Sequence, residues 1–181
     1  GGTAWFGLLK VAEAKAGEVI FVSAAAGAVG STVTQIAKAK GMKVIGSAGG
    51  AEKCAWVKEL GADAVIDYKS AKVLPQLMAA LKDMSESGID VYFENVGGKV
   101  FDAVAPLLNT KSRVSVCGMI SQYGLADPHI SRQLWNETGQ PHFDRNDVTI
   151  HDLFVGNFVK DYQTKFLAEA SAWYRDGELK Y

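Results

Sequence analysis

The stretch VIFVSAAAGAVGSTVTQIAKAKG, Val19 to Gly41, starts as a run rich in β-branched residues, breaks at glycines, and resumes with apolar residues at helical spacing. It predicts a strand over Val19–Ser23 that leads directly into Gly27 and Gly30, with an amphipathic helix over Ala28–Lys40 behind them. A glycine turn at that position is where a phosphate group binds, because the first N–H groups of the helix point toward it. The stretch therefore raises the question of which ligand, if any, the turn holds.

The same unit of strand and helix repeats along the chain. The further strands that we expect are Val44–Ala48, Ala64–Asp67, Val91–Asn95, Arg113–Cys117 and one near Phe154–Val159. The helices between them are expected at Glu52–Leu60, Val73–Met84 and Val100–Leu108. An introductory helix is expected over Thr3–Ala14, and a last helix carries a stripe of Phe166, Leu167, Ala170, Trp173 and Tyr174. Residues Gly118–Asp147 are polar and aromatic and predict a long connection, of the kind that is often functional or mobile.

Alternating strands and helices indicate a parallel sheet, since parallel strands need crossover connections and those crossovers are right-handed. The fold class that we predict is α/β, a doubly wound six-stranded parallel sheet of the Rossmann type with helices on both faces. The glycine turn then follows the first strand, where the strand order should reverse and open a crevice.

Composition limits the classes of function. The 181 residues are 48% hydrophobic and 22% charged, and the formal net charge is -1. Without a cluster of Lys or Arg we expect no nucleic-acid or membrane partner, and without a long apolar run no transmembrane segment. Cys54 and Cys117 predict reduced, mostly buried thiols and a cytoplasmic location. Because the chain begins with Gly1-Gly2 and stops in DGELKY, we expect a piece of a larger protein.

The glycine pattern is incomplete by itself, because it reads Ala25-x-Gly27-x-x-Gly30. A tight turn without a ligand is the alternative. The context favours a dinucleotide, since Gly27 lets the backbone approach a pyrophosphate and Gly30 lets the helix pack near the strand. Ala25 fits such a turn only if its φ is negative.

The second strand indicates which dinucleotide would bind. An NAD site typically has an acid at the end of this strand, whereas here the sequence is VIGSAGGAEK. The missing acid, the small hydroxyl of Ser47, the room at Gly49-Gly50 and the nearby Lys53 favour the 2′-phosphate of NADPH. Glu52 is interpreted as a first-turn acid that faces solvent and complements the helix dipole.

The sequence evidence for other kinds of functional site is weaker. Tyr68-x-x-x-Lys72 matches the Tyr and Lys pair of short-chain dehydrogenases, but it follows the third strand instead of lying on a later helix. His129, His142 and His151 lack metal-site spacing, so we expect no metal. A methyltransferase would also want an acid at the end of the second strand.

The segments AAAGAVGSTVTQIAKAKG, GGAEKC, IDYK, VYFENVGGKVFDAV and VCGMISQY together resemble the zinc-independent medium-chain reductases. That family includes prostaglandin reductases, plant alkenal double-bond reductases and bacterial curcumin reductase. The resemblance covers most of the chain and implies that residues 1–181 are an NADP-binding Rossmann domain of a two-domain enzyme. The catalytic domain would then lie outside this sequence.

The resemblance also implies roles for single residues. Gly27, Ala28, Val29 and Gly30 would form the pyrophosphate turn, and Gly49, Lys53 and Tyr68 would surround the adenosine 2′-phosphate. Asn95 would lie by the cofactor, which we favour over a strand-end cap. The nicotinamide half would be contacted by Cys117, Gly118, Ile120, Ser121, Tyr123, Asn157, Phe158 and Val159. Tyr123 is the candidate catalytic residue. Two departures from the family pattern, Asn157 and the stretch Gly124–Asp147, leave the substrate open.

The implied reaction is hydride transfer from NADPH to the β-carbon of an α,β-unsaturated aldehyde or ketone, so the expected partner is a small-molecule enone or alkenal. A homodimer is compatible with the sequence. An NADPH-dependent quinone reductase is the nearest alternative, and a nucleotide-binding module without chemistry is the alternative from another class.

Overall fold

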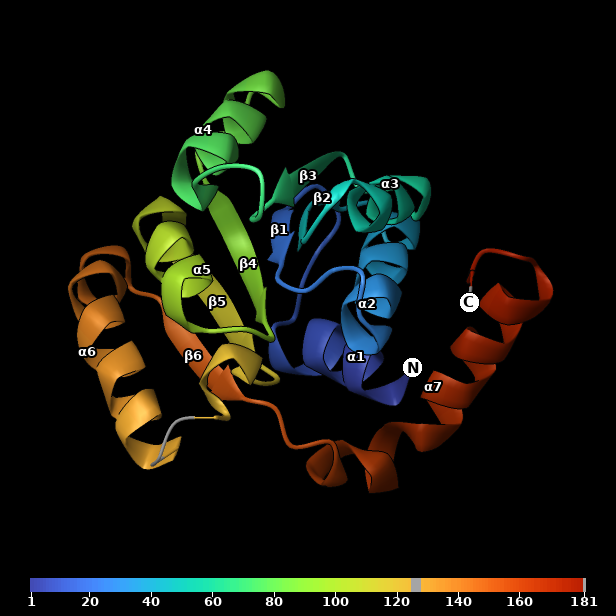
Figure 1. The fold of residues 1–181 in the computed structure, drawn as a ribbon. Coiled ribbons are helices and arrows are strands. Elements are labelled where there is room, and N and C mark those ends of the chain that lie inside the picture. Colours follow the sequence, from blue (N-terminus) through green and yellow to red (C-terminus); the bar gives the residue numbers. More distant parts are fainter. Residues whose placement is uncertain (125–127, 181) are drawn as a thin grey trace.

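A six-stranded sheet runs through the middle of the computed structural model, which describes residues 1–124 and 128–180, with the side chains of residues 128–132 and 134 left out (Figure 1). The strands are β1 (Val19–Val22), β2 (Lys43–Ala48), β3 (Ala64–Asp67), β4 (Ile89–Glu94), β5 (Leu108–Val116) and β6 (Thr149–Asp152). The helices are α1 (Gly2–Phe6), α2 (Ala28–Ala39), α3 (Ala51–Glu59), α4 (Val73–Asp83), α5 (Gly98–Val104), α6 (Pro128–Asn146) and α7 (Gly156–Arg175). Three tighter or wider turns complete the order, namely η1 (Gly7–Val11), η2 (Ala105–Leu107) and η3 (Ile120–Gln122).

The strands lie in the order β3-β2-β1-β4-β5-β6, and the neighbouring pairs are parallel. The order reverses at β1, which lies between β2 and β4. This confirms the doubly wound Rossmann sheet that the sequence predicts, and it places the glycine turn at the switch point of the sheet.

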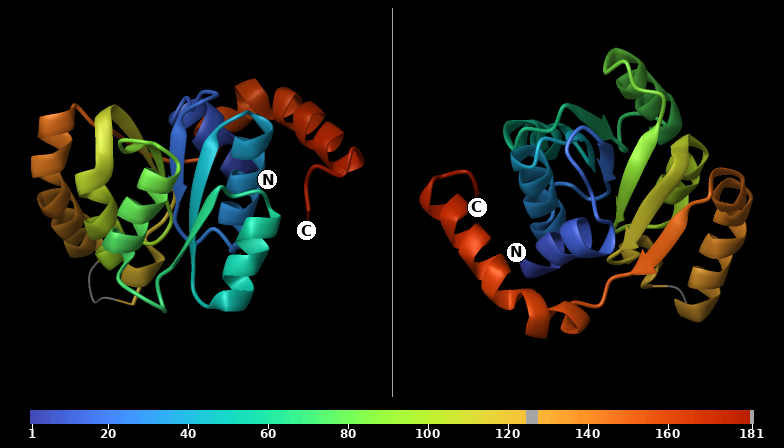
Figure 2. Two further views of the ribbon diagram at one scale, coloured as in Figure 1. Left: turned by 90° about the horizontal axis from the view of Figure 1, so that it is seen from above. Right: turned by 180° about the vertical axis from the view of Figure 1, so that it is seen from behind.

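Helices cover both faces of the sheet, and each face buries its own core. Ile20 and Val22 of β1 pack with residues of α1, α2 and α3, whereas Val19 and Phe21 pack with residues of α4, α5 and α6. Alternate residues of one strand point to opposite faces, so a strand buried on both sides is apolar throughout. Figure 2 shows the two layers of helices from above and from behind.

The prediction of a sixth strand near Phe154–Val159 is wrong, because β6 is Thr149–Asp152 and residues 156–159 begin α7. β6 lies at the edge of the sheet with only Ile150 partly buried, so it lacks the apolar signal of a core strand. The apolar residues that follow are spaced for a helix instead. Phe158 stacks on Phe6 at 5.9 Å between ring centroids, and Phe166 lies 5.7 Å from the same ring.

The stripe predicted on the last helix is only partly correct. Phe166 and Trp173 are partly buried and pack on the core beside α1, but Leu167 and Tyr174 are 49% and 66% exposed. The side of α7 that contacts the domain is therefore formed by Phe158, Tyr162, Phe166 and Trp173.

Most of the predicted connection Gly118–Asp147 is helical, since α6 spans Pro128–Asn146. Its polar sequence, with Gly139 and Pro141 inside the helix, hides this from a reading of propensity alone. Two aromatic side chains pack α6 against α5, because the ring centroids of Trp135 and Phe143 lie 4.2 Å and 5.9 Å from that of Phe101. Residues 125–127 of this stretch lie outside the described residues.

Two other boundaries shift. The introductory helix begins as α1 and continues as the π-helical turn η1, which ends at Val11. The helix predicted over Val100–Leu108 ends as α5 at Val104, and the short turn η2 contains Pro106. Leu108 already belongs to β5, which is longer than predicted.

Candidate functional site

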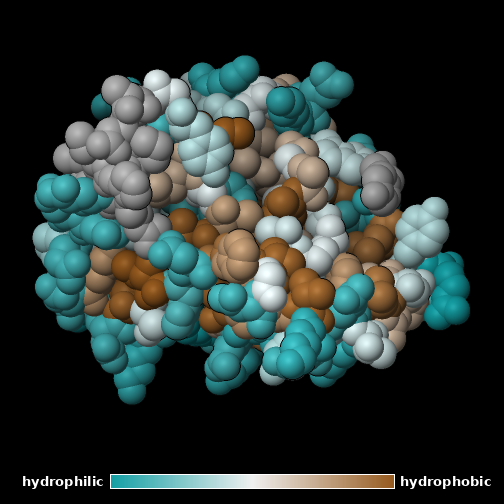
Figure 3. All heavy atoms as spheres, turned by 90° about the horizontal axis from the view of Figure 1, so that it is seen from below, coloured by the Kyte–Doolittle hydropathy of each residue, from teal (hydrophilic) through white to brown (hydrophobic). Residues whose placement is uncertain are grey.

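The turns after β1, β2, β4 and β5 meet at the carboxyl edge of the sheet, which points downward in Figure 1. Figure 3 looks onto this edge from below, and apolar residues spread across its middle with hydrophilic side chains around them. In open α/β sheets this edge is where ligands bind.

The turn between β1 and α2 is held by backbone hydrogen bonds. Gly27 N donates to Ala24 O at 2.9 Å, and Ala25 N donates to Ser47 O of β2 at 2.8 Å. The positive φ of the turn, 50°, belongs to Ala24 and not to Ala25. The condition placed on Ala25 by the sequence is thereby met.

Gly30 lies where α2 approaches the strand, since a side-chain carbon there would be 2.3 Å from Ala24 O and 2.8 Å from the Ala25 Cα. Gly27 and Ala28 are exposed at the start of α2, and Val29 is partly buried. The first N–H groups of a helix have no partner within it, so this turn offers backbone donors and the positive end of the helix dipole to an anion.

The end of β2 differs from the expectation in one respect. The hydroxyl of Ser47 is fully buried, so it is not presented to a ligand at the surface, and its suggested contact with a 2′-phosphate is wrong. Gly50, with φ 95°, turns the chain into α3, and its N–H donates to Asp67 Oδ1 at 3.0 Å. Hydrogen bonds from the backbone N–H groups of Gly50 and Lys69 lower the pKa of Asp67.

Tyr68 follows β3 and lies over Gly49, where a side-chain carbon would be 2.6 Å from the phenol oxygen. Tyr68 is 44% exposed, and Lys53 is exposed in the first turn of α3. Glu52 is also exposed there, which fits its interpretation as a solvent-facing acid. An exposed phenol, an exposed cation and a glycine therefore border this end of the edge.

A pocket of about 940 Å³ opens beside Tyr68 between α4 and α5, and we call it the α4–α5 pocket. Its lining is mostly apolar and consists of Ala24, Tyr68, Ala71, Lys72, Val73, Leu74, Val96, Lys99, Val100, Asp102, Ala103, Ile120 and Ser121. Most of these residues were not singled out by the sequence. The signal that could have found them is the apolar first turns of two helices, Val73-Leu74 and Val100, which both start at this edge of the sheet.

Asn95 follows β4 and ties it to β1. Its backbone N–H donates to Ser23 Oγ and its Nδ2 donates to Ser23 O, both at 2.7 Å. The strand-end cap, which the sequence reading considered the weaker alternative, is therefore present. A cofactor contact by Asn95 stays a prediction.

The residues after β5 fold back onto the turn after β4. Ile120 N donates to Asn95 O, and Ser121 donates through both N and Oγ to Val96 O. Tyr123 is 65% exposed, and its hydroxyl oxygen accepts a hydrogen bond from Met119 N at 3.3 Å. Burial raises the pKa of the Cys117 thiol, which is therefore a poor nucleophile at neutral pH.

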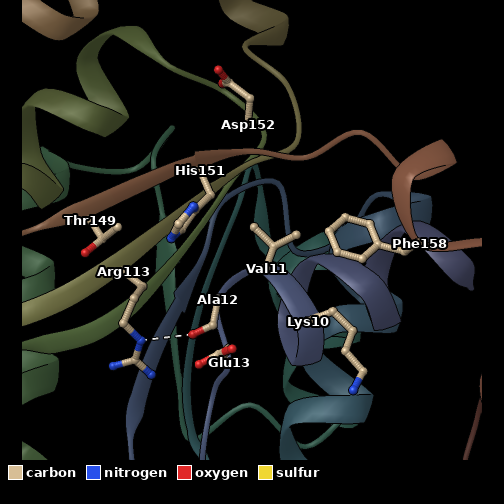
Figure 4. Close-up of a pocket in the computed structure, with 9 residues that line it drawn as sticks. All are labelled: Lys10, Val11, Ala12, Glu13, Arg113, Thr149, His151, Asp152 and Phe158. Atoms are coloured by element: carbon tan, nitrogen blue, oxygen red, sulfur yellow. Dashed lines mark hydrogen bonds between the residues drawn. The ribbon is translucent and has the colours of Figure 1, made fainter. Parts of the chain in front are cut away.

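The remaining predicted residues lie on α7. Phe158 packs against Phe6 and lines a separate polar pocket of about 450 Å³, shown in Figure 4. In that pocket Arg113 Nε donates to Ala12 O at 2.9 Å. Asn157 and Val159 are exposed beside Phe158. None of these three α7 residues lines the α4–α5 pocket.

Among the described residues, no three His, Cys, Asp or Glu side chains gather as a metal site would require. The side chain of His129 lies outside the described residues. Within residues 1–124 and 128–180, no helix is long and apolar enough to cross a membrane.

Comparison with known proteins matches residues 28–171 to a family described as zinc-binding dehydrogenase. Prostaglandin reductase 1 of Mus musculus is 41% identical over 98% of this chain and 52% of its own length. The NADPH-dependent curcumin reductase of Escherichia coli is 51% identical over 70% of the chain and 36% of its own length. The chain thus spans about half the length of the first of these curated relatives.

Solved structures are similar to this chain over nearly its full length. CurA of Vibrio vulnificus in complex with NADPH superposes with a TM-score of 0.86 at 40% identity, over 99% of this chain and 52% of that one. A quinone oxidoreductase of Pseudomonas syringae superposes with a TM-score of 0.79 at 25% identity, with the same coverage.

Proposed function

Because this chain belongs to the medium-chain dehydrogenase/reductase family, in the zinc-independent group of the prostaglandin and curcumin reductases, we propose that it forms the NADP(H)-binding domain of an enone reductase. The observation that carries the proposal is the open glycine turn at the switch point of the sheet. There Gly27 and Ala28 are exposed at the start of α2, where a pyrophosphate would meet free N–H groups.

The adenosine half of the cofactor would lie toward α3, α4 and α5. Lys53 and Tyr68 would bind the 2′-phosphate, since an ammonium group and a phenol are both donors to phosphate oxygens. The α4–α5 pocket is apolar enough for the adenine ring and lies directly beside Tyr68. Preference for NADPH over NADH follows from the absence of an acid at the end of β2, where Ala48, Gly49 and Gly50 stand.

The nicotinamide half would lie toward the turns after β4 and β5. When bound, NADPH supplies the hydride that is added to the β-carbon of the substrate. The residues of this chain orient the ring and bind its ribose, with Asn95 on one side and residues 117–123 on the other. Tyr123, an exposed phenol that follows β5 and η3, would donate a hydrogen bond to the carbonyl oxygen as negative charge develops on it.

We propose further that the substrate domain lies in the rest of a two-domain protein, since the chain covers only about half of prostaglandin reductase 1. Cys54 and Cys117 are not joined by a disulfide, which fits a cytoplasmic enzyme. A homodimer stays a prediction.

A quinone reductase is the second candidate, favoured by the likeness to the Pseudomonas quinone oxidoreductase. The test is a panel of alkenals, enones and quinones offered to the two-domain protein with NADPH. Loss of the alkene absorbance, with the saturated carbonyl compound as product, supports the enone reductase. Turnover of quinones alone would replace it by the second candidate, and cofactor binding without turnover on any substrate would indicate a module without chemistry.

A further inference from the structure

Glu94, the last residue of β4, is fully buried beneath the candidate site. Four donors point at its carboxylate. Oε1 accepts hydrogen bonds from Ser23 Oγ at 2.9 Å, Val96 N at 2.7 Å and Gly97 N at 3.0 Å. Oε2 accepts a hydrogen bond from the hydroxyl of Tyr92 at 2.5 Å.

A buried carboxylate is costly unless it is well hydrogen-bonded, and an apolar side chain could fill the same space without that cost. Both oxygens of Glu94 act as acceptors, which is the pattern of an ionised carboxylate. Tyr92 is fully buried as well, and burial together with the neighbouring charge of Glu94 raises the pKa of its phenol. The hydrogen bonds of the pair thus form a fixed arrangement of donors and acceptors beneath the site.

The bonds of Glu94 join three turns of the candidate site. Its side chain links Ser23, at the end of β1, to the turn that starts at Val96. Its backbone oxygen accepts hydrogen bonds from Cys117 N at 2.9 Å and Gly118 N at 3.1 Å, where the chain leaves β5. Glu94 therefore connects three segments by hydrogen bonds: the start of the glycine turn at Ser23, the turn Asn95–Gly97, and residues 117–123, which include Tyr123.

We propose that Glu94 is a positioning residue for hydride transfer, which sets the Asn95–Gly97 turn and, through that turn, residues 117–123 over the nicotinamide. The coupling runs through backbone hydrogen bonds, because Asn95 O and Val96 O of the same turn accept from the N–H groups of Ile120 and Ser121. The proposal rests on the proposed function for its kinetic part, but its structural part can be measured without any cofactor.

Asp90 provides a matched control on the same strand. Its carboxylate also connects β4 to its neighbours, because Oδ2 accepts from Val19 N at 2.9 Å and Oδ1 accepts from Asn109 Nδ2 at 2.8 Å. These contacts lie at the amino end of β4, the edge opposite the candidate site. Asp90→Asn therefore makes the same chemical change as Glu94→Gln without touching the turns of the site.

The experiment compares Glu94→Gln and Asp90→Asn in the two-domain protein. In Glu94→Gln the amide NH₂ cannot accept from Tyr92, and the remaining bonds lose their charge assistance. We expect hydrogen exchange at the amides of Ile120 and Ser121 to speed up by at least about tenfold, since these amides report local opening of the segment. We also expect kcat to fall at least about tenfold, because a small misplacement of the reacting groups is enough for such a loss. Asp90→Asn should leave both quantities unchanged.

Tyr92→Phe removes one donor and keeps the carboxylate, so it carries the test if Glu94→Gln does not fold, with faster exchange at the same two amides as its expected result. Unchanged exchange at Ile120 and Ser121 overturns the proposal whatever the cofactor does. Faster exchange with wild-type kcat and wild-type NADPH affinity overturns it too, since Glu94 would then only stabilise the fold. If the wild-type protein reduces no enone, the proposed function fails, and the exchange measurement still decides whether Glu94 sets these turns.

Discussion

The phenol oxygen of Tyr68 lies 2.6 Å from the position that a side-chain carbon on Gly49 would occupy, so this tyrosine rests directly on the backbone after β2. Gly49→Ala should push the ring away from the place assigned to the 2′-phosphate. Because Tyr68 is exposed and can rotate, we expect almost no change in the melting temperature. NADPH affinity should fall about tenfold, the scale of one lost hydrogen bond to a charged group.

Calorimetric titration of Gly49→Ala, Tyr68→Ala and the double variant checks this coupling. If the glycine acts through Tyr68, the double variant should lose no more affinity than Tyr68→Ala alone. Additive losses would mean that the space at Gly49 serves the ligand directly.

Lys53→Ala should weaken NADPH and spare NADH. Its side chain is exposed in the first turn of α3, and a charge-assisted contact with a phosphate is worth about 1.5 to 3 kcal/mol, roughly tenfold to a hundredfold in affinity. The control is Lys58→Ala on the same helix, because Lys58 Nζ instead donates to Asp63 O at 2.6 Å. Equal losses for both cofactors in Lys53→Ala would remove Lys53 from the recognition of the phosphate.

The central strands of the parallel sheet could be predicted because they are buried on both faces, and such strands are apolar throughout, as in Val19–Val22. The edge strand β6 could not be predicted from such an apolar run. Of its four residues only Ile150 is partly buried. Phe154 and Val155, which follow β6 in the chain, form a more apolar stretch than the strand itself. The helix α6 is not predicted for a related reason, since the buried Trp135 and Phe143 pack on the core from a largely polar sequence.

The residues of the candidate site also divide into those that the sequence predicts and those that it does not. The positions of Gly27 and Gly30 follow from local spacing, because a strand, a turn and a helix are contiguous in the chain. The α4–α5 pocket does not, since Leu74 and Val100 belong to different βα units and meet only in the folded sheet. The burial of Ser47 also depends on the folded state, because β2 is covered on both faces and alternation alone cannot expose its hydroxyl.

Asp63 should make stability depend on pH. Burial alone would raise the pKa of its carboxyl, but hydrogen bonds from Lys38 and Val44 N and the charge of Lys38 outweigh this and hold the pKa below its usual value. A pKa lowered by folding stabilises the protein above the pKa of the unfolded chain, and this contribution is lost as the pH falls through the folded value. The side chains of Asp63 and Lys38 are 33% and 31% exposed, so their ion pair contributes about 1 kcal/mol to the free energy of unfolding at pH 7.

Urea unfolding of Asp63→Asn at pH 7 and at pH 3 measures that contribution. The asparagine keeps one oxygen as an acceptor for Val44 N, but it removes the charge and one of the two oxygens that accept from Lys38 Nζ. The variant should be less stable than the wild type at pH 7, and the two should converge at pH 3. A difference that persists undiminished at pH 3 would show that the charge of Asp63 is not the cause.

The 181-residue chain alone should bind NADPH and reduce no enone at a useful rate. The pyrophosphate turn and the α4–α5 pocket lie within it, but part of the substrate pocket is expected on the other domain, so the alkene would lack the orientation that hydride transfer needs. NADPH consumption by the chain alone on an enone panel would show that the site is complete without that domain.

Tyr123 is the last and most direct test, in the two-domain protein. A phenol hydroxyl can donate a hydrogen bond to the oxygen of a developing enolate. Its hydroxyl accepts from Met119 N, which leaves its own proton available for a ligand. Tyr123→Phe should therefore lower kcat by roughly tenfold or more and leave NADPH affinity nearly unchanged.

The competing role is that Tyr123 only holds the nicotinamide ribose, with solvent supplying the proton. In that case NADPH should bind more weakly to Tyr123→Phe, and kcat at saturating NADPH should survive. Tyr174→Phe is the control, because Tyr174 is 66% exposed, close to the 65% of Tyr123, but lies near the end of α7. Steady-state kinetics on an enone and NADPH titration of both variants separate the two roles, since one acts on the transition state and the other on the bound cofactor.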